Sequence, residues 1–155
     1  MKKYILFFVS ALLIDIIISN LVFKNTKYWK NSAWEKKWWR VSSSIYHHDI
    51  LPNIDQIEIW GEKIKQRLIT NSIGFRDKEI RKISKINPDN KRILLIGDSF
   101  IEGSGLNYKD TLAGQLESYL GNEFEILNSA VGSYSPSIYY KKIKYYIEEG
   151  YKFDQ

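Results

Sequence analysis

Cysteine is absent from this sequence, which excludes a disulfide framework, thiol catalysis and any cysteine-based metal site. Histidine is nearly absent, because only His47 and His48 are present. Neighbouring side chains of an extended segment point to opposite faces, and no third ligand lies at a recognisable spacing. We therefore expect a structural or surface role for both histidines, no metal site and no cofactor.

Positive charge is unevenly spread along the chain. The formal net charge is +5 over 155 residues, with the basic excess between Lys24 and Arg92 and an acidic excess after it. Nucleic-acid binding needs a basic face on a recognisable module, and we find no such module, internal repeat or low-complexity tract. With 44% hydrophobic residues, the chain has room for one packed domain and an appendage. No nucleic-acid partner is expected.

A long apolar run opens the chain after Lys2 and Lys3. It covers residues 4–23, and about 20 such residues cross a hydrocarbon core as a helix. Asp15 lies inside the run, at a cost of about 2.5 to 3.5 kcal/mol that the surrounding Ile, Leu, Phe and Val residues offset. The run is long for a signal peptide, and no A-x-A-like cleavage site follows it. We expect residues 1–23 to be an uncleaved transmembrane anchor in a lipid bilayer.

The charges on the two sides of this run favour opposite orientations. Lys2 and Lys3 favour a cytoplasmic N-terminus, whereas the cations between Lys24 and Arg40 favour the reverse. Four tryptophans among these cations suit a membrane-interface belt or, alternatively, pack on the folded domain: Trp29, Trp34, Trp38 and Trp39. We expect the bulk of the chain to lie outside the cytoplasm.

Residues 24–90 are expected to form a basic, Trp-rich stem and lead-in region. Residues 34–45 are compatible with a short interfacial helix, and the segment around Pro52 is typical of extended or turning chain. Alternating isoleucines in residues 56–70 predict strands, and Gly74 predicts a turn. Another turn is expected just before residue 91, where the main domain begins.

From residue 91 onward the patterns alternate between strand and helix. Residues 92–97, RILLIG, form a continuous apolar run that is typical of a strand buried on both faces. Residues 110–121 predict a helix, with Asp110 as its cap and Gly121 at its end. A second strand is expected in residues 123–131.

A second helix is expected to follow that strand. Ser135 is the predicted N-cap, Pro136 the first helical residue and Gly150 the end of the helix. One face of this helix is expected to carry Tyr139, Ile143, Tyr146 and Ile147. Residues 151–155 then predict the approach to a third strand.

This alternation predicts an α/β domain with a doubly wound parallel sheet. Two strands and two helices are too few to close such a sheet, so we expect residues 91–155 to be the front part of a larger, C-terminally incomplete domain. Sites in these sheets lie beyond the carboxyl ends of the strands. Ser99 follows the first strand and residues 128–135 follow the second, so the two loops should be neighbours.

The Gly97-Asp98-Ser99 turn has the residues that a nucleophilic serine needs. Gly97 would permit a tight turn, Asp98 would accept backbone hydrogen bonds, and the N–H of Ser99 would face a developing oxyanion. Gly132 or Ser133 would supply a second N–H. One alternative is a purely structural turn. Another is a dinucleotide-binding site, but the spacing of the glycines does not match the one that such sites use. A phosphate-cradling loop is excluded because its Gly-Lys-Ser/Thr sequence is missing.

LLIGDSFIEGSG resembles the first block of the SGNH/GDSL esterases, and ILNSAVGSYSP is similar to their second block. TNSIGFRD upstream resembles a lead-in of membrane-associated relatives, so the likeness covers residues 70–155. The resemblance implies a flavodoxin-like fold in which Ser99 is the nucleophile. It also implies that Asn128 leads the oxyanion loop, with the N–H groups of Ser99 and Ser133 as donors.

The sequence departs from the family in two respects. Ser133 stands where the family has its oxyanion glycine, and the downstream Asn and D-x-x-H blocks are not present after Ser99. The resemblance implies a serine esterase or O-acyl transferase acting on cell-envelope glycan, with the general base unidentified and an inactive chain as an open outcome. A non-catalytic, membrane-anchored protein that binds envelope glycan or a partner is the alternative.

Overall fold

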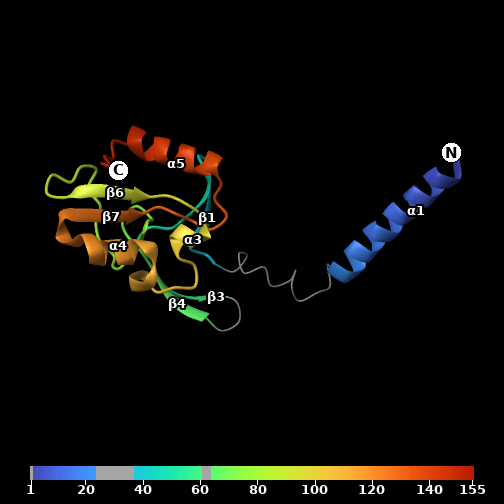
Figure 1. Cartoon of the computed structure of the whole chain (residues 1–155), viewed down its shortest axis with the longest axis horizontal. Coiled ribbons are helices and arrows are strands. Elements are labelled where there is room, and N and C mark those ends of the chain that lie inside the picture. The colour runs from blue at the N-terminus through green and yellow to red at the C-terminus, as the bar shows by residue number, and fades with distance from the viewer. Residues whose placement is uncertain (1, 24–36, 61–63) are drawn as a thin grey trace. The chain divides into compact units, whose positions relative to one another are not determined.

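The computed structural model describes residues 2–23, 37–60 and 64–155, and the chain divides into two compact units, Met1–Trp38 and Trp39–Gln155 (Figure 1). The first unit contains α1 (Lys2–Ile18), which continues into a short π-helical segment, η1 (Ser19–Phe23). Within it, Tyr4–Leu21 is long and apolar enough to cross a membrane. The predicted apolar helix is therefore present. The expectations for Trp29 and Trp34 lie outside the described residues.

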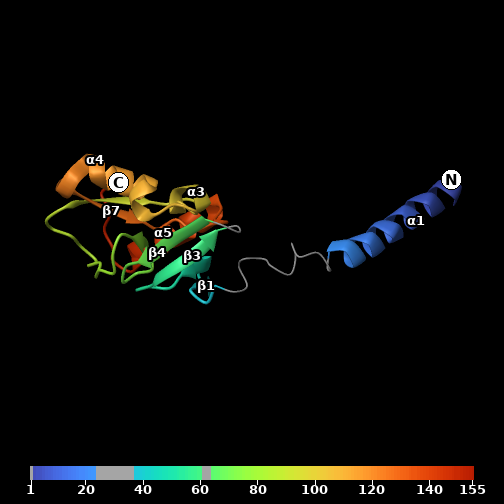
Figure 2. The ribbon, with the colours of Figure 1, turned by 90° about the horizontal axis from the view of Figure 1, so that it is seen from below.

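The second unit is built on one five-stranded sheet and a separate hairpin. The sheet has the order β3-β4-β5-β7-β6, in which only β6 and β7 run parallel. Its strands are β3 (Asp55–Trp60), β4 (Ile64–Thr70), β5 (Arg76–Asp77), β6 (Lys91–Leu95) and β7 (Phe124–Asn128). The hairpin pairs β1 (Arg40–Ser43) with β2 (His47–Ile50). Figure 2 shows the antiparallel β3 and β4 side by side.

The predicted doubly wound parallel sheet is present only in part, because β6 and β7 run parallel whereas β3, β4 and β5 join the same sheet in antiparallel directions. Antiparallel neighbouring strands need only a short connection, whereas parallel strands need a long crossover. Only three residues separate β3 from β4 in the sequence, so these two strands pair antiparallel. These strands belong to the region that we expected to be a stem and lead-in, so the boundary at residue 90 does not coincide with that of the compact unit. The helix expected in residues 34–45 is also wrong for residues 40–43, which form β1.

Helices cover both faces of the parallel pair. They are α3 (Ser99–Glu102), α4 (Leu112–Leu120) and α5 (Pro136–Glu148), with 3-10 turns η2 (Tyr108–Asp110) and η3 (Gly121–Glu123). Figure 1 shows α4 and α5 on opposite sides of β6 and β7. Ser135 and Gly121 occupy the predicted cap positions, but Thr111 replaces Asp110 as N-cap of α4 because its hydroxyl accepts from the N–H of Gly114.

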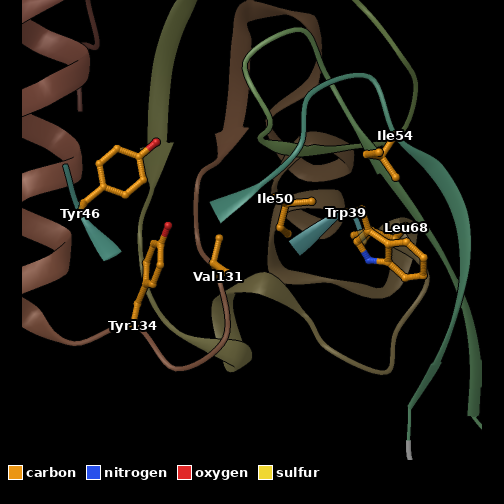
Figure 3. Packing of buried hydrophobic residues seen from close by; sticks show 7 residues of the cluster. All are labelled: Trp39, Tyr46, Ile50, Ile54, Leu68, Val131 and Tyr134. Atoms are coloured by element: carbon orange, nitrogen blue, oxygen red, sulfur yellow. The ribbon is translucent and has the colours of Figure 1, made fainter. Parts of the chain in front are cut away.

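The core joins the hairpin to the loop that follows β7. Its largest cluster consists of Trp39, Tyr46, Ile50, Ile54, Leu68, Val131 and Tyr134 (Figure 3). A buried aliphatic or aromatic side chain of this size contributes roughly 1.5 to 3 kcal/mol. Trp39 thus packs on the folded domain, which was the alternative to a place in a membrane-interface belt. Because these residues come from both sides of residue 90, the hairpin is an integral part of the unit.

The buried face of α5 differs from the expected one at two positions. Ile147 is 56% exposed, whereas Lys142 is fully buried beside Tyr146. A lysine was not expected there because an unpaired buried ammonium is very costly, and its partner comes from a distant part of the chain. Beyond α5, the chain runs along the outer edge of β6. The N–H of Asp154 donates to the carbonyl of Arg92, and the N–H of Leu94 donates to the carbonyl of Gln155. Residues 151–155 therefore approach the sheet as predicted.

Candidate active site

The loops after β6 and β7 are neighbours, as the sequence predicted. The N–H of Ser129 donates to the carbonyl of Leu95 at 2.9 Å, and the amide of Asn128 donates to the carbonyl of Ile101 at 2.9 Å. Two residues further along each loop, the N–H of Val131 donates to the carbonyl of Gly97 at 3.3 Å. Buried Asn128 thus connects the second loop to the helix that begins at Ser99.

Ser99 is the first residue of the four-residue helix α3 and is partly exposed. Asp98 caps this helix, since its Oδ1 accepts from the N–H of Phe100 at 3.0 Å, as predicted. At the other end, the carbonyl of Ser99 accepts from the N–H groups of Gly103 and Ser104 at 3.0 Å. Within residues 2–23, 37–60 and 64–155, no side chain forms a hydrogen bond with the Ser99 hydroxyl. The bend is therefore well held, but no base is placed there.

Gly97 has a different role from the one expected. Its φ is not in the left-handed region, so the turn does not depend on the backbone freedom of glycine. A Cβ at this position would lie 2.4 Å from Cγ1 of Ile101. Gly97 is required because α3 packs directly against the end of β6.

Residues 131–134 form a tight turn after β7. The N–H of Tyr134 donates to the carbonyl of Val131 at 3.2 Å, and Ser133 has φ of 68° at the third position. A positive φ there is typical of a type II turn, which normally uses glycine. Ser133 is exposed, and its N–H donates no hydrogen bond to any residue that the structure describes. A backbone N–H without an internal acceptor is what an oxyanion requires.

Replacing Ser133 by glycine is expected to stabilise the protein by about 1 kcal/mol, because serine carries a steric penalty in the left-handed region that glycine does not. The turn and its N–H are retained. The measurement is the urea dependence of unfolding of the full chain in detergent micelles. Ser133→Ala serves as the control, since alanine has the same penalty. An equal gain with alanine would contradict a backbone origin.

Two side chains that the sequence did not predict hold the peptide groups around Gly132. Its N–H donates to Oε2 of Glu102 at 2.5 Å, so it is already bound and cannot be the oxyanion donor. Its carbonyl lies 2.8 Å from Nε2 of His48. Gly132 therefore belongs to the loop as expected, but only the N–H of Ser133 remains for a ligand.

The two histidines do not point to opposite faces. Their Nδ1 atoms lie 2.7 Å apart, and His47 has φ of 90°, which breaks the alternation of an extended strand. The ring of His48 also packs edge-to-face on Tyr134, with 4.9 Å between ring centroids. His48 is thus a neighbour of the candidate site. No sequence signal indicates this contact, because His48 and Gly132 are 84 positions apart.

Glu102 is fixed by a buried ionic network. Nη2 of Arg40 lies 2.5 Å from Oε1 of Glu102 and 3.2 Å from Oε1 of Glu58, whose other carboxylate oxygen, Oε2, accepts from the amide of Gln66. Burial lowers the pKa of Arg40, but the two carboxylates outweigh it and leave that pKa raised. Both carboxylate side chains are fully buried, so their pairing with Arg40 is a condition for folding.

A second buried ion pair lies behind the loop. Nζ of Lys142 is 2.8 Å from Oδ1 of Asp49 and 3.1 Å from the hydroxyl of Tyr134, which itself donates to the carbonyl of His48. Burial lowers the pKa of Lys142, and the charge of Asp49 opposes that effect. The pair therefore supports both the turn and the hairpin that carries His48.

The described residues contain no group of three or more potential metal ligands. A pocket of about 460 Å³ lies between β4, η2 and α4, and none of the predicted site residues lines it. The proximity of the Ser99 and Ser133 loops, together with the quoted motifs, is thus the basis for any likeness to SGNH/GDSL enzymes. Comparison of the chain with protein-family models, curated proteins and solved structures finds no match in any of the three.

Proposed function

We propose that the compact unit is an SGNH-type domain of flavodoxin-like fold in which Ser99 performs acyl-ester chemistry. The observation that carries this proposal is that two adjacent loops each present a backbone N–H without a hydrogen-bond acceptor among the described residues. The N–H of Ser99 is an unpaired donor at the start of α3, and that of Ser133 belongs to an exposed residue of the turn. Backbone donors of this kind stabilise the oxyanion of acyl transfer.

In the proposed reaction, Oγ of Ser99 forms a bond to the acyl carbon and its proton passes to a base. The carbonyl oxygen becomes an oxyanion that accepts from the N–H groups of Ser99 and Ser133. Collapse of this intermediate breaks the ester bond, and the alcohol leaves with a proton. An O-acyl group on envelope glycan is the substrate class that the resemblance suggests.

The test is covalent labelling of the full chain in detergent micelles with an alkyl fluorophosphonate. The serine oxygen displaces fluoride from phosphorus, so the product mimics the tetrahedral intermediate. Peptide mass spectrometry is expected to find the phosphonyl group on Ser99. Labelling that is spread over exposed serines, or that is absent, would reject Ser99 as a nucleophile.

A non-catalytic protein that binds envelope glycan or a partner is the second candidate. It is favoured by one observation, the absence of any base on the Ser99 hydroxyl among the described residues. This candidate predicts no labelling at Ser99, together with retention of the folded chain on a glycan matrix. The labelling experiment therefore separates the two functions.

We also propose that α1 anchors the protein in a bilayer with its compact unit outside the cytoplasm. A reporter that is active only outside the cytoplasm, fused after Gln155, is expected to be active, because Lys2 and Lys3 favour retention of the N-terminus inside. The same fusion with a reporter active only in the cytoplasm is the control. Activity of the cytoplasmic reporter alone would mean that the cations after residue 23 determine orientation.

A further inference from the structure

We propose that His48 and Glu102 are positioning residues that clamp the peptide groups on both sides of Gly132 and so aim the N–H of Ser133 at the oxyanion. This inference rests on the proposed function of Ser99. Glu102 holds the N–H of Gly132, and His48 holds its carbonyl, at 2.5 and 2.8 Å. With both neighbouring peptide groups bound, the turn has one orientation.

The orientation of the Ser133 N–H follows from peptide geometry. The carbonyl of Gly132 and the N–H of Ser133 belong to one peptide group, and the described chain contains no cis peptide bond. In a trans peptide the two bonds point in opposite directions. Because Nε2 of His48 binds the carbonyl on one side, the N–H must point to the other, where Ser133 is exposed.

The hydrogen-bond partner also determines the tautomer of His48. A carbonyl oxygen only accepts, so Nε2 of His48 carries the proton and donates it to Gly132. When His48 is neutral, its Nδ1 accepts, and the neighbouring Nδ1 of His47 at 2.7 Å is the donor. A continuous chain of donors then runs from His47 through His48 and the peptide group to the oxyanion. Each bond in such a chain polarises the next.

Such a clamp acts mainly in the transition state. As negative charge develops on the substrate oxygen, the Ser133 N–H donates more strongly, the Gly132 carbonyl becomes more negative, and the bond from His48 strengthens. An interaction that is stronger in the transition state than in the ground state raises the rate of the chemical step without tightening initial binding. A purely structural histidine would affect stability alone.

Glu102 and its partners make the clamp rigid from the other side. The side chain is fully buried, its Oε1 pairs with Arg40, and its backbone carbonyl accepts from Arg76 at 2.6 Å. Since Glu102 is also the last residue of α3, the helix that begins with Ser99 and the turn that contains Ser133 are joined through one side chain. The two oxyanion donors are thereby held in a fixed relation.

The experiment compares His48→Gln with His48→Asn by the rate of fluorophosphonate labelling at Ser99 in the full chain. The amide nitrogen of glutamine can take the place of Nε2, whereas that of asparagine corresponds to Nδ1 and cannot reach Gly132. Loss of one oxyanion donor costs 10²- to 10³-fold, and loss of its orientation a part of that. We expect about a tenfold lower maximal labelling rate for asparagine, an unchanged half-saturating concentration, and near-complete rescue by glutamine. Ser42→Ala, on the exposed position opposite His48 in the hairpin, is the control and should label normally.

Each outcome supports or overturns the inference. Equal maximal rates for the asparagine and wild-type proteins would overturn the clamp while leaving Ser99 as nucleophile. A lower melting temperature with unchanged labelling at a temperature where both are folded would likewise reduce His48 to a structural residue. Failure of the wild type to label at Ser99 would reject the proposed function, and the inference would fall with it.

Discussion

Replacing Ser99 by alanine is expected to abolish fluorophosphonate labelling and any ester hydrolysis by the full chain. Alanine removes the nucleophilic oxygen and leaves both backbone donors in place. Where a complete catalytic triad is present, loss of its nucleophile costs on the order of 10⁶-fold in rate. In this chain no base contacts the Ser99 hydroxyl among the described residues, so hydrolysis is expected near background even with serine present. Labelling, which needs only one turnover, is the sensitive measurement.

The same substitution should leave stability almost unchanged. Ser99 is partly exposed, and its backbone rather than its side chain closes α3. A substitution of this kind normally changes the free energy of unfolding by less than about 0.5 kcal/mol. Ser104→Ala is the matched control, since that hydroxyl lies five positions on and is buried without a hydrogen-bond partner. It should label at the wild-type rate.

A structural Ser99 predicts the reverse pattern. Loss of a turn hydrogen bond would destabilise the protein by about 1 kcal/mol, and labelling would persist at another residue. Melting curves and labelling of the same three proteins therefore decide between the two roles.

The local elements around the site could be predicted from sequence because their signals are local. The apolar run before Gly97 predicts β6, and Ser135 followed by Pro136 predicts the start of α5. Their adjacency followed from a general rule for parallel strands. The rest of the sheet depends on non-local pairing. β5 pairs with β7 through a single residue pair, Arg76 with Asn128, and no pattern in either segment predicts this contact.

The polar part of the core could not be predicted for the same reason. Glu58 and Gln66 face inward while Ile57 and Ile59 are exposed, so the usual polarity of a half-buried strand is inverted in β3 and at the start of β4. This inversion is stable because Arg40 supplies the compensating charge, and Arg40 lies in a different strand. The partner that makes such a buried carboxylate possible lies 18 positions away, so the alternation within one strand does not predict it. The proximity of the two histidine rings could not be predicted either, since the positive φ of His47 is not visible in the sequence.

Removing the charge of Asp49 is expected to destabilise the compact unit strongly. In Asp49→Asn, the ammonium of Lys142 would remain buried without a counter-ion, 1% exposed at its side chain. Removing one partner of a buried pair typically costs 3 to 5 kcal/mol. Lys142 can limit the loss by folding in its neutral form. Neutralising a lysine of pKa about 10.4 at pH 7 costs about 4.6 kcal/mol, which falls in the same range.

The pair has an exposed counterpart that serves as a control. Lys144 and Glu148 lie on the same helix, 3.7 Å apart, with side chains more than half exposed. Glu148→Gln should change the free energy of unfolding by less than about 0.5 kcal/mol, since water screens such pairs. A double variant, Asp49→Asn with Lys142→Met, should recover most of the stability that the single variant loses, because no buried charge remains. Failure of this rescue would assign the loss to the Asp49 hydrogen bond with Tyr46 instead.

The pH dependence of the Asp49→Asn protein distinguishes a charge effect from lost packing. The pKa of Lys142 is lowered in the folded state, so between this pKa and about 10.4 the unfolded chain binds more protons than the folded one. Stability must then rise with pH across that window, by up to about 1.4 kcal/mol per pH unit for one group. In the wild type the window lies closer to 10.4, because the charge of Asp49 opposes the effect of burial.

Urea unfolding of the full chain at pH 7 and pH 9 should therefore show that the stability lost by the variant shrinks at the higher pH. An equal loss at both values would mean that Lys142 keeps its charge without Asp49, and that the aromatic rings and the hydroxyl of Tyr134 around its ammonium are sufficient to hold it.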